Sequence, residues 1–452
     1  MPARFRARPG ADFFDEAFST GELVNVPASE GLDERMAVGM EGFDELFTPS
    51  ARRAPSRAAE SGPRTFRSPR FQGDPALDNV LNDRLLLDVG SRGAHVAKVQ
   101  QALLDLGYPV PLGADGTYSA GTGTTVRQFQ TDQRLLVPAM LIDGIVGPQT
   151  MGRLDEAIAN LRVRKDVTTL SAAERTALAT AINTLKTSGT YHNFVRDHAN
   201  SMPNAHRQSA FLPWHRQFIL NYESELRAID ASITLPYWNW SADPGVVGAA
   251  TTWNAAMVAL MGGNGTGPNN AVTTGPFAGW MVANSTGALT ALPLQREFGV
   301  TQATLPSLAD VTSALALTPY DVAPWDDSLT TGFRNELEGW SAGNRPPGRN
   351  ALHNAVHLWV GGSMEPGTSP NDPCFFLHHC FVDKLWADWQ AAFPSQTYLP
   401  ATAAGSAPGL NDDMRIAQVT SATPFKVKPA ETLNNKVLRD QRGTRGIVVR
   451  YA

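Results

Sequence analysis

The sequence has 452 residues, of which 42% are hydrophobic and 18% charged, with a formal net charge of −5 and two cysteines. A mildly acidic chain lacks the basic excess that neutralises phosphates, which argues against a nucleic-acid partner, and two cysteines exclude a disulfide-rich scaffold. No stretch approaches the roughly 20 consecutive apolar residues of a membrane-spanning helix.

Residues 1–82 are predicted to form a low-complexity and largely disordered leader. Arg, Pro, Ala, Ser and Gly dominate its second half, and few residues there could be buried in a core. Its first residues carry charges without an apolar segment, so no signal peptide is recognisable. The cellular location therefore stays open between the cytoplasm and export by a non-standard route.

Residues 83–160 are predicted to form a small domain of three short helices. Apolar residues recur every three or four positions from Val96 to Leu106 and again at Val126 and Phe129, and a glycine-punctuated turn leads into the third helix. The order of the turns and helices resembles the peptidoglycan-binding domain of bacterial cell-wall proteins. The residues that carry this resemblance include Gly93, Gln100, Asp115-Gly116, Phe129-Gln130, Asp143-Gly144 and Pro148. The resemblance implies a cell-wall glycan as a partner, and the alternative is a domain that only packs on the rest of the chain as a spacer or lid.

Residues 161–184 are predicted to be a connecting helix, because "AAERTALATAINTLK" is strongly amphipathic. A large domain follows over residues 185–452. Eight of the nine histidines of the chain lie in this domain, in one cluster at 192–215 and another at 353–379.

The first cluster predicts three imidazoles that converge from two helices and a loop. His198 lies near the end of one helix, His215 lies in the first turn of the next, and His206 lies on the connection between them. Three histidines within 18 residues, beside several aromatic residues, are typical of a metal site rather than of isolated core histidines. His192 falls on a different helical face and is predicted to be structural or exposed.

The second cluster predicts another three ligands. His353 and His357 are four residues apart and share one face of a helix. His379 lies on a helix that begins after Pro373, whereas His378 lies on a different face. Asp383 follows His379 by four residues, so its carboxylate is predicted to hold this imidazole, or that of a neighbouring ligand, in one tautomer. Two sets of three imidazoles favour two ions of a redox or borderline metal over magnesium or calcium.

Two long motifs in these clusters resemble the copper motifs of tyrosinases. The first is His206-(four residues)-Phe211-Leu212-Pro213-Trp214-His215, and the second is Asp372-Pro373-Cys374-Phe375-(three residues)-His379-(three residues)-Asp383. The resemblance implies that 185–452 is a tyrosinase copper-binding domain with two copper ions. One ion would be held by His198, His206 and His215, and the other by His353, His357 and His379. It also implies that O₂ and phenols are the reactants, with ortho-hydroxylation of monophenols and oxidation of o-diphenols to o-quinones.

Glu338 and Asn354 match two further positions of this family. The resemblance implies that they orient a water that takes the proton of a phenol. A catechol oxidase or an o-aminophenol oxidase without the monophenol step remains an alternative. An oxygen carrier and a wall-binding protein with an inactive oxidase domain are two others. The small size of the chain argues against the carrier, and the six intact histidines argue against an inactive site.

The expected fold class is mainly α. Four antiparallel helices would hold the copper pair in a four-helix-bundle core. Long loops and a few short strands, at 233–238 and 446–452, would surround this core, and the small three-helix domain would precede it.

Overall fold

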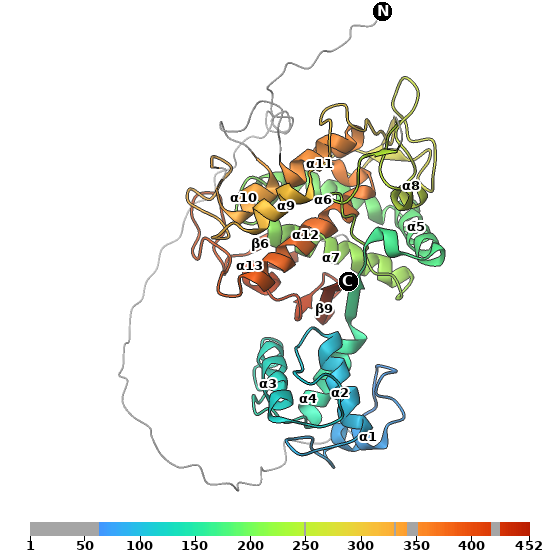
Figure 1. The fold of residues 1–452 in the computed structure, drawn as a ribbon. Coiled ribbons are helices and arrows are strands. Elements are labelled where there is room, and N and C mark those ends of the chain that lie inside the picture. The colour runs from blue at the N-terminus through green and yellow to red at the C-terminus, as the bar shows by residue number, and fades with distance from the viewer. Residues whose placement is uncertain (1–62, 248–249, 330, 341–350, 417–424) are drawn as a thin grey trace, which may run out of the picture.

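The computed structural model describes residues 63–247, 250–329, 331–340, 351–416 and 425–452. Its architecture is mainly helical, as predicted, with a small helical domain at one end and a larger domain that holds both histidine clusters (Figure 1). None of the described helices is long and apolar enough to cross a membrane. Most of the predicted leader, residues 1–62, lies outside the described ranges.

The small domain begins earlier than the sequence predicted and has four helices rather than three. They are α1 (Pro75–Leu81), α2 (Ala94–Asp105), α3 (Ala120–Arg134) and α4 (Pro148–Ala159). The extra helix α1 starts at a proline, and the Asp74 side chain caps it by accepting hydrogen bonds from the N–H groups of Ala76 and Leu77. Leu77 and Val80 are fully buried in the domain core. The residues between 63 and 82 are therefore part of this domain and not of a disordered leader.

Two equivalent turns organise the small domain. The Gln100 side chain accepts a hydrogen bond from the N–H of Gly116 (2.8 Å) and donates one to Asp115 (2.9 Å). Gln130 on the next helix makes the same two bonds with the turn at 143–144. Both turn glycines have φ +75°, which residues with a Cβ rarely adopt. The motif that carries the family resemblance is thus a pair of helix–turn units, each held together by hydrogen bonds from a glutamine side chain to the turn.

The junction between the domains is a strand and not the predicted connecting helix. Strand β1 (Leu161–Arg164) leaves α4 directly and pairs in parallel with β9 (Arg445–Tyr451), which also pairs with β8 (Leu438–Arg439). The predicted helix begins only at the start of α5 (Ala172–Thr187). Its N-terminus is set by a capping box at Ser171. The partner of β1 is the end of the chain, so no local pattern could show this pairing.

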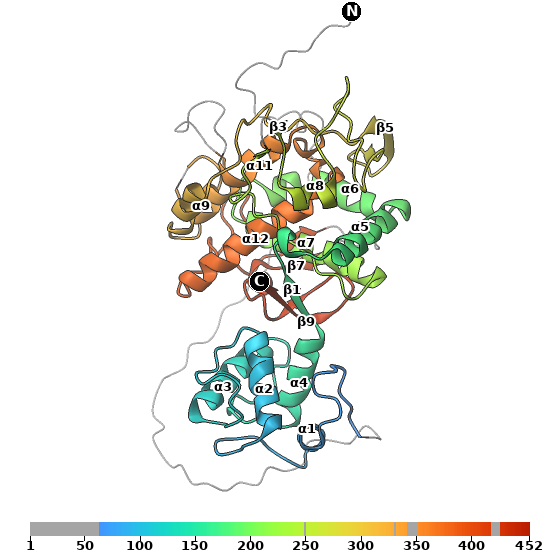
Figure 2. The same cartoon turned by 45° about the vertical axis from the view of Figure 1, so that its right-hand side comes forward.

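Side chains near the C-terminus fix the small domain to the large one. The Lys436 ammonium donates to the Gly107 carbonyl (3.2 Å) and lies 3.9 Å from the centre of the Tyr108 ring. Asn434 donates to Asp132 (2.8 Å), and Val448 is buried in the core of the small domain. Figures 1 and 2 show this domain at the end of the molecule opposite α11, below β1 and β9. Among the described residues it does not cover the histidine clusters.

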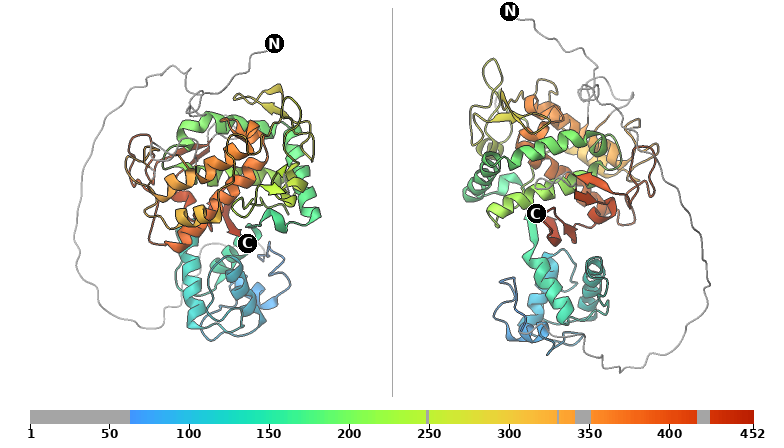
Figure 3. Two further views of the ribbon diagram at one scale, coloured as in Figure 1. Left: turned by 45° about the horizontal axis from the view of Figure 1, so that its top comes forward. Right: turned by 180° about the vertical axis from the view of Figure 1, so that it is seen from behind.

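Helices α6, α7, α11 and α12 form the centre of the large domain (Figure 3). Helix α7 packs against α5, α6 and α12, and α11 packs against α12. The helices of this domain after α5 are α6 (Thr190–Ala205), α7 (Phe211–Ile229), α8 (Ala255–Met261), α9 (Leu308–Leu315), α10 (Phe333–Glu338), α11 (Leu352–Val360), α12 (Cys374–Ala392) and α13 (Pro429–Thr432). Short 3-10 turns lie at Val167–Thr169, Gly362–Met364 and Ser369–Asn371.

Short strands lie at the edges of the large domain. They are β2 (Val246–Val247), β3 (Ala250–Thr251), β4 (Met281–Ala283), β5 (Leu289–Pro293), β6 (Met414–Ile416) and β7 (Phe425–Val427), which pair two by two as antiparallel ribbons. The strand predicted at 446–452 lies almost entirely within β9. The strand predicted at 233–238 is instead an extended loop with one bridge, between Tyr237 and Asp166.

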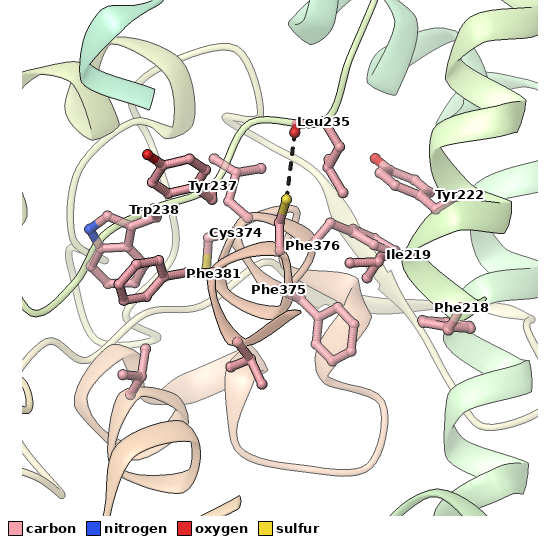
Figure 4. Close-up of a cluster of buried hydrophobic side chains, with 14 of the residues drawn as sticks. Phe218, Ile219, Tyr222, Leu235, Tyr237, Trp238, Cys374, Phe375, Phe376 and Phe381 are labelled. Atoms are coloured by element: carbon pink, nitrogen blue, oxygen red, sulfur yellow. Dashed lines mark hydrogen bonds between the residues drawn. The ribbon is translucent and has the colours of Figure 1, made fainter. Parts of the chain in front are cut away.

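An aromatic core joins α7 to α12 (Figure 4). The rings of Tyr222 and Phe376 stack with their centres 3.5 Å apart, and Phe218 stacks on the same phenylalanine. Cys374 and Cys380 are buried free thiols, and the Cys380 thiol donates to the Leu235 carbonyl (3.5 Å). This packing sets the spacing of the two helices that carry His215 and His379.

Candidate metal centre

Two ligand candidates of the first histidine group are supplied by helices. His198 lies on α6, and α7 begins at Phe211, so His215 is its fifth residue and lies just past the first turn in which it was predicted. The Nδ1 atom of His198 lies 2.7 Å from the Gly367 carbonyl oxygen, and that of His215 lies 2.8 Å from the Phe211 carbonyl oxygen. A carbonyl can only accept, so both Nδ1 atoms carry the proton and both Nε2 atoms carry a lone pair. Among the described atoms, neither Nε2 has a hydrogen-bond partner.

His206 completes the first group from a connection, as predicted. It follows the last residue of α6 and has an extended backbone, and Arg207 after it has φ +59°. The centre of its ring lies 5.0 Å from that of His198 and 4.7 Å from that of His215. The three residues can place their ligand atoms within 4.8 Å of one another.

The second group is carried by α11 and α12. The Nδ1 atom of His353 lies 2.8 Å from Asn354 Oδ1 and 3.2 Å from the Glu338 carbonyl oxygen, and that of His357 lies 2.7 Å from the Met364 carbonyl oxygen. These contacts turn both Nε2 atoms toward α12. His379 Nε2 lies 3.2 Å from His353 Nε2 and 3.4 Å from His357 Nε2.

The second group fits one metal ion. A proton on His379 Nε2 would be shared between the lone pairs of His353 and His357, whereas one cation among the three nitrogens satisfies all of them. Two nitrogens bound at about 2.0–2.1 Å to one tetrahedral ion are separated by about 3.3 Å, which matches these distances. Burial lowers the pKa of His198 to about 3 and that of His357 to about 4, so these imidazoles are neutral ligands. Sets of neutral imidazoles suit copper and exclude magnesium or calcium.

The two groups face each other. The rings of His215 and His379 stack with their centres 4.3 Å apart and their planes 12° apart. The ring centres of His206 and His353 lie 6.2 Å apart. Phe375 lies between the groups, with its ring 4.9 Å from that of His198 and 4.1 Å from that of His379. The arrangement is a binuclear centre, lined by aromatic rings.

His378 lies closer to the centre than the sequence indicated. It belongs to the second group of possible ligands, with its ring parallel to that of His353 at 5.0 Å. Helix α11 crosses α12 at a point where both of the consecutive histidines can face it. His379 nevertheless makes the short Nε2 contacts and also stacks on the first group. His192, in the first turn of α6, lies outside both groups, as predicted.

The role predicted for Asp383 differs from its contacts. Its carboxylate accepts hydrogen bonds from Arg216 Nε (2.5 Å), Arg164 Nη1 (3.1 Å) and the Tyr451 hydroxyl, and no histidine is among these partners. A buried carboxylate needs a cation more than it needs a neutral imidazole, so the arginines take its oxygens. Backbone carbonyls and one amide hold the imidazoles of His198, His215, His353 and His357 instead.

Glu338 and Asn354 lie beside the second group. Glu338 is the last residue of α10 and fully buried, and its carboxylate accepts from the Arg207 N–H (2.7 Å) and from Arg334 Nη1 (3.0 Å). Burial raises the pKa of this carboxyl to about 7, against the opposite effect of Arg334. Asn354 Oδ1 is engaged by His353, whereas its Nδ2 has no partner among the described residues.

Comparisons with known proteins agree with this geometry. The family model for the common central domain of tyrosinase matches residues 188–392, and that for a peptidoglycan binding domain matches residues 92–154. A tyrosinase of Streptomyces antibioticus is 41% identical over 267 residues, which are 56% of this chain and 92% of that protein.

One further relative and one solved structure are similar to a larger share of the chain. Grixazone synthase of Streptomyces griseus is 37% identical over 317 residues, which cover 61% of this chain and 97% of that protein. A solved structure of a polyphenol oxidase from Thermothelomyces thermophila is 20% identical, covers 78% of this chain and 98% of that chain, and superposes with a TM-score of 0.48. On its converging histidine groups and its identity with the Streptomyces enzymes, this chain belongs to the tyrosinase family of binuclear copper phenol oxidases.

Proposed function

We propose that this chain hydroxylates monophenols at the ortho position with O₂ and oxidises the resulting o-diphenols to o-quinones. In this proposal His198, His206 and His215 hold one copper ion, and His353, His357 and His379 hold the other. One monophenol and one O₂ give one o-quinone and one water, so one oxygen atom enters the ring and the other leaves as water.

The observation that carries the proposal is the stacking of His215 on His379, which brings two buried groups of imidazoles face to face. When bound, the copper pair supplies the redox chemistry that activates O₂. The chain supplies the geometry, since the protonated Nδ1 atoms of four histidines are tied to fixed acceptors. It also excludes water, since Phe211 and Phe375 pack against the imidazoles of both groups.

Glu338 and Asn354 handle the phenolic proton in this proposal. The Glu338 carboxylate accepts hydrogen bonds from the Arg207 N–H, from Arg334 and from the Trp340 side chain, which leaves one of its roughly four acceptor sites for a water. Asn354 Nδ2 is a free donor among the described residues. A water held between such a donor and such an acceptor can take the proton from a phenol. A base is expected to matter more for a monophenol, which has a single hydroxyl that must lose its proton before the ring is hydroxylated, than for an o-diphenol, whose two adjacent hydroxyls give up their protons as the ring is oxidised.

The test measures O₂ uptake by the copper-loaded chain with p-cresol and with catechol in parallel. We expect uptake with both substrates. Asn354→Asp keeps an acceptor for His353 but removes the amide donor, whereas Asn354→Leu removes both. We expect Asn354→Asp to lower the monophenol rate by about 100-fold, with the catechol rate changed only a few-fold.

Two outcomes would contradict this assignment. Uptake with catechol alone by the unsubstituted chain would make it a diphenol oxidase. An equal loss of both rates in Asn354→Asp, together with loss of copper, would mean that Asn354 only orients His353.

We also propose that the small domain binds cell-wall glycan. Its support is the family match at 92–154, and the number of large apolar side chains exposed on this domain, such as Leu112 (67%) and Leu135 (69%). The full chain should co-sediment with insoluble peptidoglycan and not with cellulose. Leu135→Ser should weaken this binding, and Leu308→Ser, equally exposed on the large domain (67%), should not. Equal sedimentation with both polymers would reject a specific glycan site.

A further inference from the structure

Among the six proposed ligands, His206 is the one whose backbone is not part of a helix. It has φ −131° and ψ 162°, just after α6 ends, and no helix carries it. Arg207 after it is a non-glycine residue at φ +59°, a left-handed conformation that residues with a Cβ rarely adopt. Contacts from elsewhere in the chain must therefore hold the segment from His206 to Ser209 in place.

Those contacts come from a segment more than 100 residues further along the chain. The Glu338 carboxylate accepts the N–H of Arg207 at 2.7 Å. The Tyr320 hydroxyl donates to the carbonyl oxygen of Ser209 at 2.7 Å, and the Ser209 hydroxyl donates to Asp321. Both ends of the short segment after His206 are thus tied.

Arg334 joins these contacts into one buried network. Its guanidinium lies 3.0 Å from Asp321 through Nε and 3.0 Å from Glu338 through Nη1. Arg334, Asp321 and Glu338 are all 0% exposed. Arg334 Nη2 also donates to the Asp326 carbonyl (2.8 Å), and Asp326 forms a backbone bridge with Gln208 inside the tied segment. We name Tyr320, Asp321, Arg334 and Glu338 the His206 clamp.

We propose that the His206 clamp positions His206 to hold the first copper ion. The inference rests on the ligand set of the proposed function and goes beyond it, because Tyr320, Asp321 and Arg334 act on His206 only through the backbone of residues 207–209. These three are positioning residues. Without the clamp, the connection can relax its left-handed residue and move the imidazole away from His198 and His215.

The geometry makes a selective prediction for copper. His353, His357 and His379 lie on α11 and α12, so the affinity for the second ion depends far less on the hydroxyls of Tyr320 and Ser209. The clamp reaches the second group through the backbone carbonyl of Glu338, which lies 3.2 Å from His353 Nδ1 and which neither hydroxyl deletion removes. Outer partners of metal ligands typically change metal affinity by about 10- to 100-fold when they are removed. Weakening the clamp should therefore lower the affinity for one copper ion by this amount and spare the other.

The experiment uses the full chain with two mild substitutions, Tyr320→Phe and Ser209→Ala, which each delete one hydroxyl. The matched control is Tyr398→Phe. Tyr398 is also a buried tyrosine, packs 5.2 Å from the Tyr320 ring and donates to the Pro408 carbonyl (2.6 Å), away from the clamp. Copper bound per chain is measured against buffered free Cu(II), together with the electron paramagnetic resonance spectrum and the melting temperature of the copper-free chain.

We expect the double variant to pass through a state with one copper per chain. An isolated Cu(II) ion has one unpaired spin and gives a resonance signal, whereas two neighbouring ions couple their spins and give none. The control and the unsubstituted chain should hold two ions, and all copper-free melting temperatures should agree.

If the double variant binds each of the two copper ions as tightly as the control does, the inference is overturned. Parallel loss of both ions with a lower melting temperature would also overturn it, because the clamp would then only stabilise the fold. Failure of the unsubstituted chain to bind two ions would instead reject the proposed ligand set.

Discussion

The two histidine groups reach similar geometries by different means. The second group stands on two helices, with His353 and His357 one turn apart on α11 and His379 on α12. The first group uses α6 and α7 for His198 and His215 but takes His206 from a connection. A helix fixes a ligand by its own hydrogen bonds, whereas a ligand on a connection depends on contacts from distant segments.

This difference also appears in how the imidazoles are oriented. His215 is held by the carbonyl of Phe211, four residues earlier in the same helix, and His357 by that of Met364, seven residues later. His198 is held by Gly367, which is 169 residues away. The second group is therefore largely local, and the first group depends on the folded state of the whole domain.

The largest expected effect comes from removing one ligand of either group. We expect His215→Ala and His379→Ala each to bind one copper ion fewer and to lower O₂ uptake by about 1,000-fold, because a lost metal removes several kcal/mol of catalysis. Copper content and uptake with catechol measure this. His192→Ala, on α6 but outside both groups, is the control and should keep both properties. A variant of either group that keeps two ions would remove that histidine from the ligand set.

The next largest effect is a loss of stability that involves the helices of both histidine groups. Arg164 on β1 pairs with Glu223 of α7 (2.9 Å) and Asp383 of α12 (3.1 Å), the helices that carry His215 and His379. We expect Arg164→Leu to lower the free energy of unfolding by about 2–3 kcal/mol, because it removes one of the two arginines that Glu223 and Asp383 each pair with. Urea unfolding measures this change. Lys165→Ala removes an exposed pair with Glu174 and should cost less than about 1 kcal/mol. Similar losses in both variants would show that the buried network is not essential.

A third prediction compares the groups by pH in the copper-free chain. Burial depresses the pKa of the six imidazoles below the ordinary 6.5, to about 3 for His198 and about 4 for His357. Below pH 6.5 the unfolded chain therefore binds protons that the folded chain does not, so stability falls as the pH falls toward these values. Each such histidine contributes a slope of about 1.4 kcal/mol per pH unit. Glu338 has the opposite effect on the slope, because its pKa is raised from 4.5 to about 7 in the folded chain. Between these values the folded chain binds one proton that the unfolded chain does not, so the stability from this group is lost as the pH rises.

Urea unfolding of the copper-free chain between pH 5 and 6 measures this slope. His198→Gln in the first group and His357→Gln in the second should each reduce it by about 1.4 kcal/mol per pH unit. An unchanged slope in one variant would mean that this imidazole is already protonated in the folded chain.

The sequence predicted what local periodicity controls. The helices of His353, His357 and His379, the connection of His206 and the mainly helical fold follow from apolar spacing and from motifs whose residues are close in sequence. It could not show β1, whose partner β9 lies at the other end of the chain. It also assigned Asp383 to an imidazole, because spacing along α12 does not show that Arg164 and Arg216 approach from other elements.

His378 and the His206 clamp escaped prediction for a related reason. Two consecutive histidines point in different directions on one helix, and only the crossing of α11 over α12 decides that both face the centre. Tyr320 and Asp321 carry no signal in a single sequence, since their partner Ser209 lies more than 100 residues away. Long-range polar contacts are thus the part of this site that only the fold reveals.

The smallest expected effect tests the one long-range carbonyl of the first group. A Cβ at Gly367 would lie 3.1 Å from Met202 Cγ, the middle of a flexible side chain that can give way. The carbonyl that holds His198 stays in the Gly367→Ala variant. Removing an outer partner lowers metal affinity by about 10-fold or more, so we expect a smaller loss of copper affinity here. This loss should affect only the first ion. Gly152→Ala on α4, where the nearest atom lies 3.9 Å away, is the control. A loss that falls on both ions equally would mean that His198 and the second group share this support, and that the two groups are not held independently.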